Sequence, residues 1–438
     1  MKLSKHAKFY KLGINEVVVY NNLIFEPIIL TNEEKNNLKS GCLDNFNDDE
    51  IKVLKEKGIL INTFKQDSEV EDKLLHYYNQ DNAVSLAYII PTNYCNLKCK
   101  YCFIGKLEDK DKIFIDDLTI KNTIDKLAEE NKDFALEKTT IIFYGGEPLV
   151  ALNQIVKICD YCQKNYPDKF EFAIVTNATL LTENAISVFE KYHITVGISI
   201  DGPRKTNDKN RIFKNNNNSV YDIVVKNIDR LKTSYVNFGL SITISKDVLN
   251  DKQFFPWLKS LGVKDVSYNL LHFNTIDPEF EDYYKKASKF LLKSNEVLKN
   301  TGIIEDRLNR KINAFHSKSM KFNDCAAVGG QQICVDPNGK VTVCHGFWHT
   351  QEDRCGNINL DSLQEIKDHP NFIKWKQRTT INNKKCINCP AIYICGGGCY
   401  LQSERQYNQS DRLDKGFCIH TKATLKWLLK NQLTNTQK

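Results

Sequence analysis

The pattern of apolar and polar residues divides the chain into three parts. Between about residues 84 and 300, six short runs rich in β-branched and aromatic residues alternate with longer segments of helical periodicity. The six runs are residues 85–91, 139–146, 170–177, 195–202, 238–245 and 266–273. Six strand–helix units in succession predict parallel strands with right-handed crossovers, and therefore an α/β barrel or a doubly wound sheet.

Residues 1–80 have a different pattern, which predicts a small separate module. Two β-rich runs on either side of Asn21 and Asn22 indicate a hairpin. Thr31 and Glu34 form a capping box that predicts a helix closed by Gly41. The remaining predicted elements are a capped helix closed by Gly58, a strand at 59–64 and a solvated linker over the charged run 65–73. This order of elements predicts a winged-helix-like unit.

Length and charge narrow the class of protein. A chain of 438 residues is expected to form two or three domains. The net charge of +7 is small and spread along the chain, without the basic stripe of a nucleic-acid-binding surface. The N-terminal segment lacks the apolar core of a signal peptide, and no apolar run approaches the roughly 18 residues of a membrane helix. We therefore expect a cytoplasmic protein with no nucleic-acid or membrane partner.

Cysteine is the unusual component of this composition. Of the 15 cysteines, three lie within residues 95–102, and nine lie between Cys325 and Cys418. Structural disulfides are not expected in a reducing cytoplasm, so this clustering indicates metal binding. Cys159 and Cys162 imitate a metal-binding pair, but they share an apolar helix face, so we expect them in the core. Cys42 lies beside a helix end and is expected to be structural.

The first cysteine group has the sequence NYCNLKCKYCF, with Cys95, Cys99 and Cys102 as its three thiols. Thiolate is the usual ligand of iron–sulfur clusters. Three thiolates leave one iron without a protein ligand, and that iron is open to a substrate or cofactor. The loop follows the first predicted barrel strand, at the end where such folds place their chemistry. The alternative is a partial zinc knuckle.

This C-x3-C-x2-C motif, with Tyr101 before its last cysteine, resembles that of the radical S-adenosylmethionine (SAM) superfamily. The resemblance implies that SAM binds the open iron and is cleaved to a 5′-deoxyadenosyl radical. Three more stretches at strand ends agree with it, and the resemblance implies that they hold SAM through its amino group, ribose and carboxylate. They are YGGEP with Gly145, Gly146 and Glu147, TNAT with Thr176 and Asn177, and SIDGP with Ser199 and Asp201, followed by Arg211.

The C-terminal cysteines resemble the seven-cysteine SPASM extension, which implies two auxiliary [4Fe–4S] clusters. The pattern is C-x13-G-x4-C from Cys325 through Gly339 to Cys344, then C-x2-C-x5-C-x3-C, then a last cysteine. The resemblance assigns the distal cluster to Cys386, Cys389, Cys395 and Cys418, and the proximal cluster to Cys325, Cys344 and Cys399. The fourth proximal ligand is Cys334, Cys355 or a substrate thiolate on an open iron; we favour Cys355 or an open site. Two structural zinc sites are the alternative.

The N-terminal module resembles the peptide-recognition domain of enzymes that modify ribosomally made peptides. The resemblance implies that it binds a leader peptide as an added β-strand. The alternative is an N-terminal extension without a binding role.

Together these features predict three parts: a leader-binding winged-helix-like module (1–80), a partial (β/α)6 barrel (85–305) and a cysteine-rich SPASM domain (320–425). The resemblance implies a radical SAM peptide maturase with three [4Fe–4S] clusters and SAM, whose product is a peptide cross-link, most often a cysteine thioether. Its expected partners are a precursor peptide with its leader and an external electron donor such as flavodoxin or ferredoxin. No catalytic base is identified.

Two alternative functions are open at this point. An anaerobic sulfatase maturase shares the barrel and both auxiliary clusters and makes formylglycine. Those enzymes typically carry an aspartate after the cysteine matching Cys344, where this chain has His345, and they usually lack the N-terminal module. A non-catalytic zinc-binding interaction protein is the second alternative, and it would contain zinc instead of iron.

Overall fold

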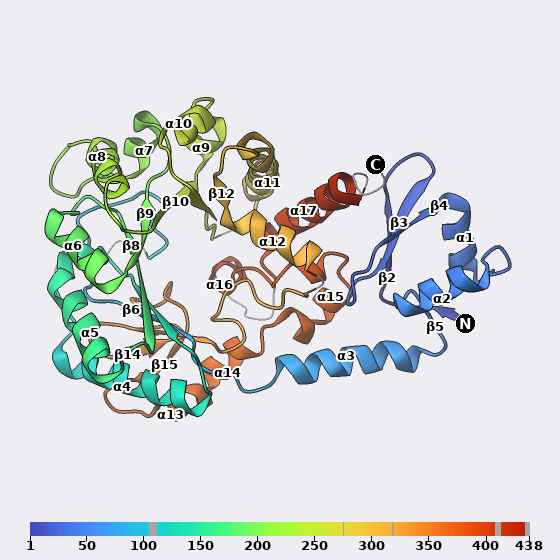
Figure 1. The fold of residues 1–438 in the computed structure, drawn as a ribbon, viewed down its shortest axis with the longest axis horizontal. Coiled ribbons are helices and arrows are strands. Elements are labelled where there is room, and N and C mark those ends of the chain that lie inside the picture. Colours follow the sequence, from blue (N-terminus) through green and yellow to red (C-terminus); the bar gives the residue numbers. More distant parts are fainter. Residues whose placement is uncertain (105–111, 275, 318, 408–412, 434–438) are drawn as a thin grey trace.

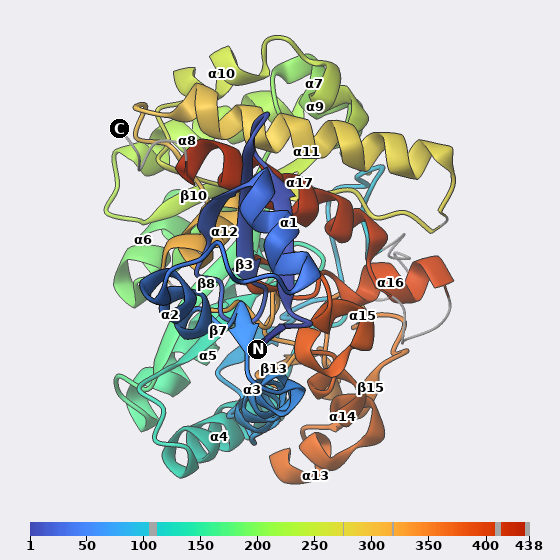
Figure 2. The same ribbon diagram turned by 90° about the vertical axis from the view of Figure 1, so that its right-hand side faces the viewer.

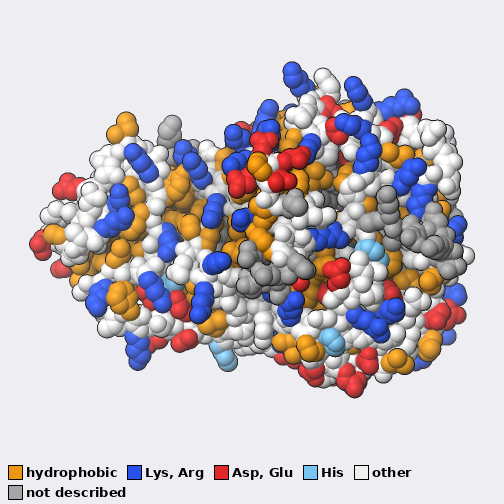
Figure 3. Space-filling view, turned by 180° about the vertical axis from the view of Figure 1, so that it is seen from behind, with side chains coloured by type: hydrophobic (Ala, Val, Ile, Leu, Met, Phe, Trp, Pro, Cys, Tyr) orange, Lys and Arg blue, Asp and Glu red, His pale blue; other side chains and the backbone are white. Residues whose placement is uncertain are grey.

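The computed structural model describes residues 1–104, 112–274, 276–317, 319–407 and 413–433. Figure 1 shows the α/β barrel at one end of the molecule and the N-terminal module at the other end. Part of the C-terminal region lies between them, and its strands lie beside the barrel. Basic and acidic side chains are interspersed over the face shown in Figure 3. None of the described helices combines the length and apolar character needed to cross a membrane.

All six predicted barrel strands are present and run parallel in sequence order. They are β6 (Leu86–Ile89), β7 (Thr139–Phe143), β8 (Phe170–Thr176), β9 (Thr195–Ser199), β10 (Phe238–Ile244) and β11 (Asp265–Leu270). The helices between and after them are α4 (Asp117–Asp133), α5 (Leu152–Asn165), α6 (Glu183–Tyr192), α7 (Arg204–Asn210), α8 (Val220–Lys232), α9 (Lys246–Asn250), α10 (Phe254–Ser260) and α11 (Pro278–Leu298). Cys159 and Cys162 on α5 are buried in the barrel core, as predicted.

The sheet is longer than the sequence predicts, because the cysteine-rich region continues it. Strand β12 (Ile304–Glu305) pairs with β11, and β13 (Gln332–Val335) pairs in parallel with β6. Strands β14 (Lys340–Thr342) and β15 (Arg354–Asn357) extend this edge in antiparallel fashion. The first barrel strand is therefore not an edge strand, since the C-terminal region pairs with it.

The rest of the C-terminal region is helical and irregular. Its elements are α12 (Asp306–His316), α13 (Leu363–Asp368), α14 (Pro370–Lys376), α15 (Lys384–Ile387), α16 (Tyr400–Tyr407) and α17 (Lys415–Leu433). Three short 3-10 turns also occur in the chain, η1 (Pro148–Ala151), η2 (Thr380–Asn382) and η3 (Ile392–Ile394).

The N-terminal module contains the predicted hairpin and capped helices. Its strands are β1 (Lys2–Leu3), β2 (Ala7–Lys11), β3 (Glu16–Asn21), β4 (Ile28–Thr31) and β5 (Leu60–Ile61), and its first helices are α1 (Asn32–Ser40) and α2 (Asp48–Glu56). Strands β2, β3 and β4 form one antiparallel sheet, and β1 pairs with β5. The capping box of Thr31 and Glu34 is present, and Gly41 has a φ of 77°. The hairpin turn spans residues 22–27 and is longer than a two-residue turn.

The predicted linker over residues 65–73 is wrong, because this run lies inside α3 (Phe64–Tyr78). Most of its charged residues are exposed or half-buried, but Asp67 is buried and accepts hydrogen bonds from the Ser4 hydroxyl (2.6 Å) and the Lys5 amide (3.0 Å). Val70, Leu74 and Tyr78 recur at helical spacing and pack against the C-terminal region. The linker prediction considered only the charge of this run, and it therefore missed the apolar stripe.

The N-terminal module packs directly on the cysteine-rich region. Val18, Tyr20 and Phe25 share an apolar cluster with residues of η3, α12 and α17, and Figure 2 shows the module lying over these two helices. The side-chain amide of Asn22 donates to the carbonyl oxygens of Ile387 (2.9 Å) and Cys389 (2.8 Å). The module is therefore part of the surroundings of the distal cysteines.

Candidate functional site

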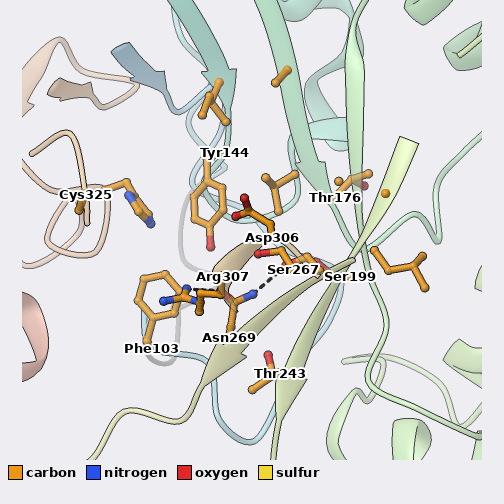
Figure 4. A pocket seen from close by; sticks show the side chains of 18 of the residues that line it. Phe103, Tyr144, Thr176, Ser199, Thr243, Ser267, Asn269, Asp306, Arg307 and Cys325 are labelled. Atoms are coloured by element: carbon orange, nitrogen blue, oxygen red, sulfur yellow. Dashed lines mark hydrogen bonds between the residues drawn. The ribbon is translucent and has the colours of Figure 1, made fainter. Parts of the chain in front are cut away.

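One large cavity contains most of the predicted site residues. It has a volume of about 1580 Å³ and runs through the barrel interior (Figure 4). Cys95, Cys99 and Cys102 line it, and so do Cys325, Cys344 and Cys399 from the C-terminal region. Single-ligand pockets usually measure about 300–1,000 Å³. The cavity therefore has room for a cofactor and a substrate side chain together.

The barrel cysteines lie on a loop that follows β6 and is fixed by backbone hydrogen bonds. The Lys98 and Lys100 amides donate to the carbonyls of Ile212 (2.8 Å) and Asn210 (3.0 Å). Burial raises the pKa of Cys95 to about 12 and that of Cys99 to about 11. These thiols are protonated in the metal-free protein, so metal binding releases protons.

Gly145 and Gly146 bring the end of β7 against the cysteine loop. A Cβ on Gly146 would lie 2.1 Å from the carbonyl oxygen of Tyr94, and one on Gly145 would lie 2.5 Å from Ile90. The next amide, that of Glu147, donates to the Tyr94 carbonyl at 2.8 Å. The glycines line the cavity as predicted, but the close approach that demands them is to the loop of the cysteines.

The Glu147 carboxylate connects the ends of β7 and β8. It is buried and accepts hydrogen bonds from the Thr176 hydroxyl (2.5 Å) and the Asn177 amide (2.8 Å). Burial raises its pKa to about 7. The Asn177 side chain in turn donates to Asn96 of the cysteine loop (2.9 Å). Three of the predicted cofactor-contacting residues thus also hold one another and the loop in place.

Asp201 organises a second group of predicted residues. Arg211 binds its carboxylate through two hydrogen bonds of 3.0 Å, and the Thr243 amide donates to it at 3.0 Å. The Tyr101 hydroxyl donates to the same carboxylate. Arg211, Tyr101 and Ser199 line the cavity, whereas Asp201 lies behind them. The geometry gives Asp201 the role of positioning Tyr101 and Arg211.

Aromatic rings form one wall of the cavity, which sequence reasoning missed apart from His345. The ring centroids of Tyr88 and His345 lie 4.2 Å apart, those of Tyr144 and His345 4.9 Å, and those of Phe103 and His272 5.5 Å. Phe103 and Tyr144 are labelled in Figure 4. Phe103 directly follows Cys102, which is the one sequence signal that could have indicated it.

The two histidines of this wall are neutral near pH 7. Burial lowers the pKa of His272 to about 3 and that of His345 to about 4. Within the described part of the chain, the Nδ1 atom of each ring is buried without a hydrogen-bond partner. Both residues line the cavity, so a group bound there could supply the missing hydrogen bonds.

The proximal set groups three thiols and leaves two other cysteines aside. Burial, followed by the charges of Cys325, Asp353 and Cys399, raises the pKa of Cys344. The Cys355 thiol contacts the carbonyl oxygen of Asp353 at 3.2 Å and does not line the cavity, and neither does Cys334. The structure therefore presents three thiols to the cavity, and Cys355 as a ligand stays a prediction.

The distal set lies under the N-terminal module. The Cys389 amide donates to the Cys386 carbonyl (2.8 Å), and Cys395 contacts the hydroxyl of Thr421 (4.0 Å). Burial, followed by the charge of Cys395, raises the pKa of Cys418, which places these thiols near one another. Within the described ranges, no three His, Cys, Asp or Glu side chains are close enough together to hold a single metal ion. The donor chemistry of both sets, soft thiolate, fits iron–sulfur clusters.

Comparison with known proteins gives two family matches. Residues 89–261 match the radical SAM superfamily, and residues 325–390 match the SPASM iron–sulfur cluster-binding domain. The radical SAM cyclopropyl synthase TigE of Paramaledivibacter caminithermalis is 26% identical over 411 residues, which cover 86% of this chain and 81% of TigE. A cysteine-type anaerobic sulfatase-maturating enzyme of Clostridium perfringens is 26% identical over 328 residues, covering 70% of this chain and 85% of that enzyme.

Solved structures share the fold. Native anSMEcpe with bound AdoMet matches 81% of this chain and 100% of its own, with a TM-score of 0.69 and 20% identity. Streptococcus suis SuiB bound to the precursor peptide SuiA matches 95% of this chain and 99% of its own, with a TM-score of 0.55 and 17% identity. Fold, cysteine pattern and family matches agree, and the chain therefore belongs to the radical SAM superfamily as an enzyme with a C-terminal SPASM domain.

Proposed function

We propose that this enzyme installs a cross-link within a ribosomally made precursor peptide. The observation that supports this most directly is the shared cavity, in which the barrel thiols and the proximal thiols line one space of about 1580 Å³. A peptide side chain attacked at the barrel site therefore lies beside the second set of thiols. Membership of the superfamily favours this activity over the zinc-binding alternative.

The cofactor set follows from the cysteine groups. We propose one [4Fe–4S] cluster on Cys95, Cys99 and Cys102, and two more on the proximal and distal sets. SAM would lie against Gly145, Gly146, Ser199 and Arg211, which line the cavity. When bound, the reduced cluster and SAM supply a 5′-deoxyadenosyl radical that takes a hydrogen atom from the substrate. An external donor such as flavodoxin or ferredoxin would supply the reducing electron.

The protein's own residues position the cofactor-facing groups, bind the peptide and shield the reaction space from water. The Glu147 and Asp201 networks hold the ends of β7, β8 and β9 against the cysteine loop, which fixes the cofactor-facing residues. The aromatic wall excludes water from the space where a radical would form. His272 and His345 offer neutral nitrogens to the peptide.

A cysteine thioether is the first candidate for the bond formed. Three proximal thiols face the cavity while Cys355 is turned to a backbone carbonyl, which supports an open position for a substrate thiolate. Joining a carbon radical to a thiol sulfur releases one proton and one electron. The reaction therefore needs a one-electron acceptor, and a cluster on the proximal set, which lines the same cavity, could serve.

A carbon–carbon bond is the second candidate. The similarity to a cyclopropyl synthase extends over 86% of this chain. The aromatic wall also suits a hydrocarbon side chain, because flat apolar surfaces pack well against one another.

Formylglycine formation has weaker support. The anSMEcpe structure leaves about a fifth of this chain unmatched, since it covers 81%. The SuiB match, at 95%, extends over the N-terminal module. The position after Cys344 holds a neutral histidine in place of an aspartate.

Mass spectrometry of a cognate precursor after anaerobic incubation with SAM and reductant separates these reactions. A thioether gives a peptide lighter by two hydrogen atoms whose cysteine no longer reacts with iodoacetamide. A carbon–carbon link gives the same mass loss with any cysteine still reactive. A hydrazine-reactive product that lacks sulfur would assign the enzyme to the sulfatase-maturating type, and an unmodified peptide despite SAM cleavage would overturn peptide maturation.

The same proposal makes the N-terminal module the docking site of the leader peptide. Strands β2 and β4 are the two edges of its sheet, and an extended peptide could add to either edge. Fluorescence anisotropy with leader peptides N-methylated at alternate residues tests this without altering the enzyme. Strand addition uses every second amide of the peptide. Methylation of the odd-numbered amides or of the even-numbered amides should therefore abolish binding, whereas methylation of the other set should not. Equal binding of both peptides would exclude strand addition.

A further inference from the structure

Among the described residues, three lysine or arginine side chains are buried, and one of them has no carboxylate within 4.0 Å. Arg211 binds Asp201 at 3.0 Å, and Lys367 binds Glu130 at 3.0 Å. Lys311 on α12 is fully buried, and no described carboxylate lies within 4.0 Å of its Nζ. A buried charge without a counter-charge is strongly unfavourable. The aromatic neighbour of Lys311, the Phe417 ring at 4.2 Å, is also neutral, so an anionic group bound nearby would stabilise the Lys311 charge.

The surroundings of Lys311 identify where that anion lies. Its Nζ donates to the carbonyl oxygens of Ile394 (3.3 Å) and Cys395 (3.4 Å) and to the Thr421 hydroxyl (3.2 Å). Cys395 is a distal cysteine, and Thr421 lies one helical turn beyond the distal Cys418 on α17. All three neutral acceptors thus belong to the segments that carry the distal thiols.

The acidic group that acts most on Lys311 is shared with other cations. Asp324 attracts Lys311, and its carboxylate is bound by Lys321 (2.8 Å) and flanked by Arg310 (3.8 Å) and Arg307 (3.9 Å). Arg310 also pairs with Asp306 at 3.1 Å. Among the described side chains, Lys311 therefore has no carboxylate of its own and shares Asp324 with three cations that lie closer to it.

We propose that the Lys311 ammonium is the fixed counter-charge of the distal iron–sulfur cluster and raises its reduction potential. This rests on the proposed assignment of a cluster to Cys386, Cys389, Cys395 and Cys418. Four thiolates around an iron–sulfur core give a net negative charge, which grows by one on reduction. A nearby cation stabilises the reduced form more than the oxidised form, so the potential rises. The cluster then accepts more readily the single electron that leaves the substrate with loss of a proton.

The test is Lys311→Met in the full chain, reconstituted anaerobically with iron and sulfide. Methionine has a similar length and no charge. Potentiometric titration followed by electron paramagnetic resonance should give a more negative midpoint for an auxiliary cluster. At a fixed potential the ratio of reduced to oxidised cluster should be at least about tenfold lower, which equals about 59 mV for a one-electron couple. An unchanged midpoint with full iron content would overturn the proposal.

Two further variants separate charge from structure. Lys311→Gln keeps a hydrogen-bond donor without the charge, so it should show the same negative shift, and a wild-type midpoint would refute a charge effect. Lys367→Met removes a buried lysine that is paired with Glu130, and it should leave the midpoint unchanged. Iron and sulfide contents that account for the barrel cluster alone in the wild-type protein would instead refute the distal assignment itself.

Discussion

Replacing Gly146 by alanine tests whether the end of β7 and the cysteine loop are held as one unit. The added Cβ would lie 2.1 Å from the Tyr94 carbonyl oxygen, 2.4 Å from its carbon and 3.0 Å from the amide nitrogen of Cys95. All three are backbone atoms, so no side-chain rotation relieves the contact. The loop that carries Cys95 must move away from β7.

The size of the effect follows from these distances. The contact to the Tyr94 oxygen must open from 2.1 Å to at least 3.0 Å, which breaks the 2.8 Å hydrogen bond from the Glu147 amide. Overpacking of a buried site costs about 1–3 kcal/mol. Loss of a buried hydrogen bond adds about 1 kcal/mol. We expect the free energy of unfolding to fall by about 2–4 kcal/mol in total.

Function should suffer more than stability, because the displaced residue precedes a predicted cluster ligand. Gly146→Ala should lose about a third of the iron, if each of three clusters holds the same number of iron atoms, and should lose SAM cleavage. Gly197→Ala is the matched control, since a Cβ there meets its nearest atoms at an ordinary 3.6 Å. Wild-type iron content and SAM cleavage in Gly146→Ala would show that the loop does not depend on this close packing.

Three other predictions follow from the site. Replacing all three barrel-loop cysteines by alanine should abolish deoxyadenosine formation and remove about a third of the iron; full deoxyadenosine formation would contradict the cluster assignment. Asn22→Ala removes the donor to the carbonyls of Ile387 and Cys389, and each unsatisfied carbonyl costs about 1–3 kcal/mol of stability. Iron analysis should therefore show loss of the distal cluster, while SAM cleavage is retained. His272 has a pKa lowered to about 3 from 6.5. Between these values its side chain binds a proton in the unfolded apoprotein but stays neutral in the folded protein. Measured in urea, the free energy of unfolding of the wild-type protein should therefore fall by about 2 kcal/mol more than that of His272→Phe between pH 6.5 and about pH 5. Equal decreases in the two proteins would refute this.

The barrel was predictable from sequence because its signal is local. Each of the six strand runs is a short segment rich in β-branched and aromatic residues, and all six are strands in the structure. The capping box at Thr31 is equally local, and it is present. The added strands β13 to β15 were not predictable in this way, because they are short and their pairing with β6 joins residues far apart in the chain.

The motif residues could be found from the sequence, but their contacts within the protein could not. Gly146 belongs to a stretch expected to hold SAM, and in the structure it also makes room for the backbone of Tyr94. Asp201 belongs to another such stretch, and its carboxylate is engaged by Arg211, Tyr101 and Thr243. Spacing in a sequence indicates which residues meet at a site. It does not show which of them face the ligand and which hold their neighbours.

Under the proposed function, the aromatic wall bears on which bond would be formed. Phe103 follows Cys102, His345 follows Cys344, and the two ring centroids lie 5.8 Å apart. A ring next to the barrel thiols is thus in contact with a ring next to the proximal thiols. Under the proposed function, a substrate segment attacked at the barrel site would lie in the cavity that the proximal set also lines. This proximity favours a link between residues that are close together in the precursor, whether the second partner is a sulfur or a carbon atom.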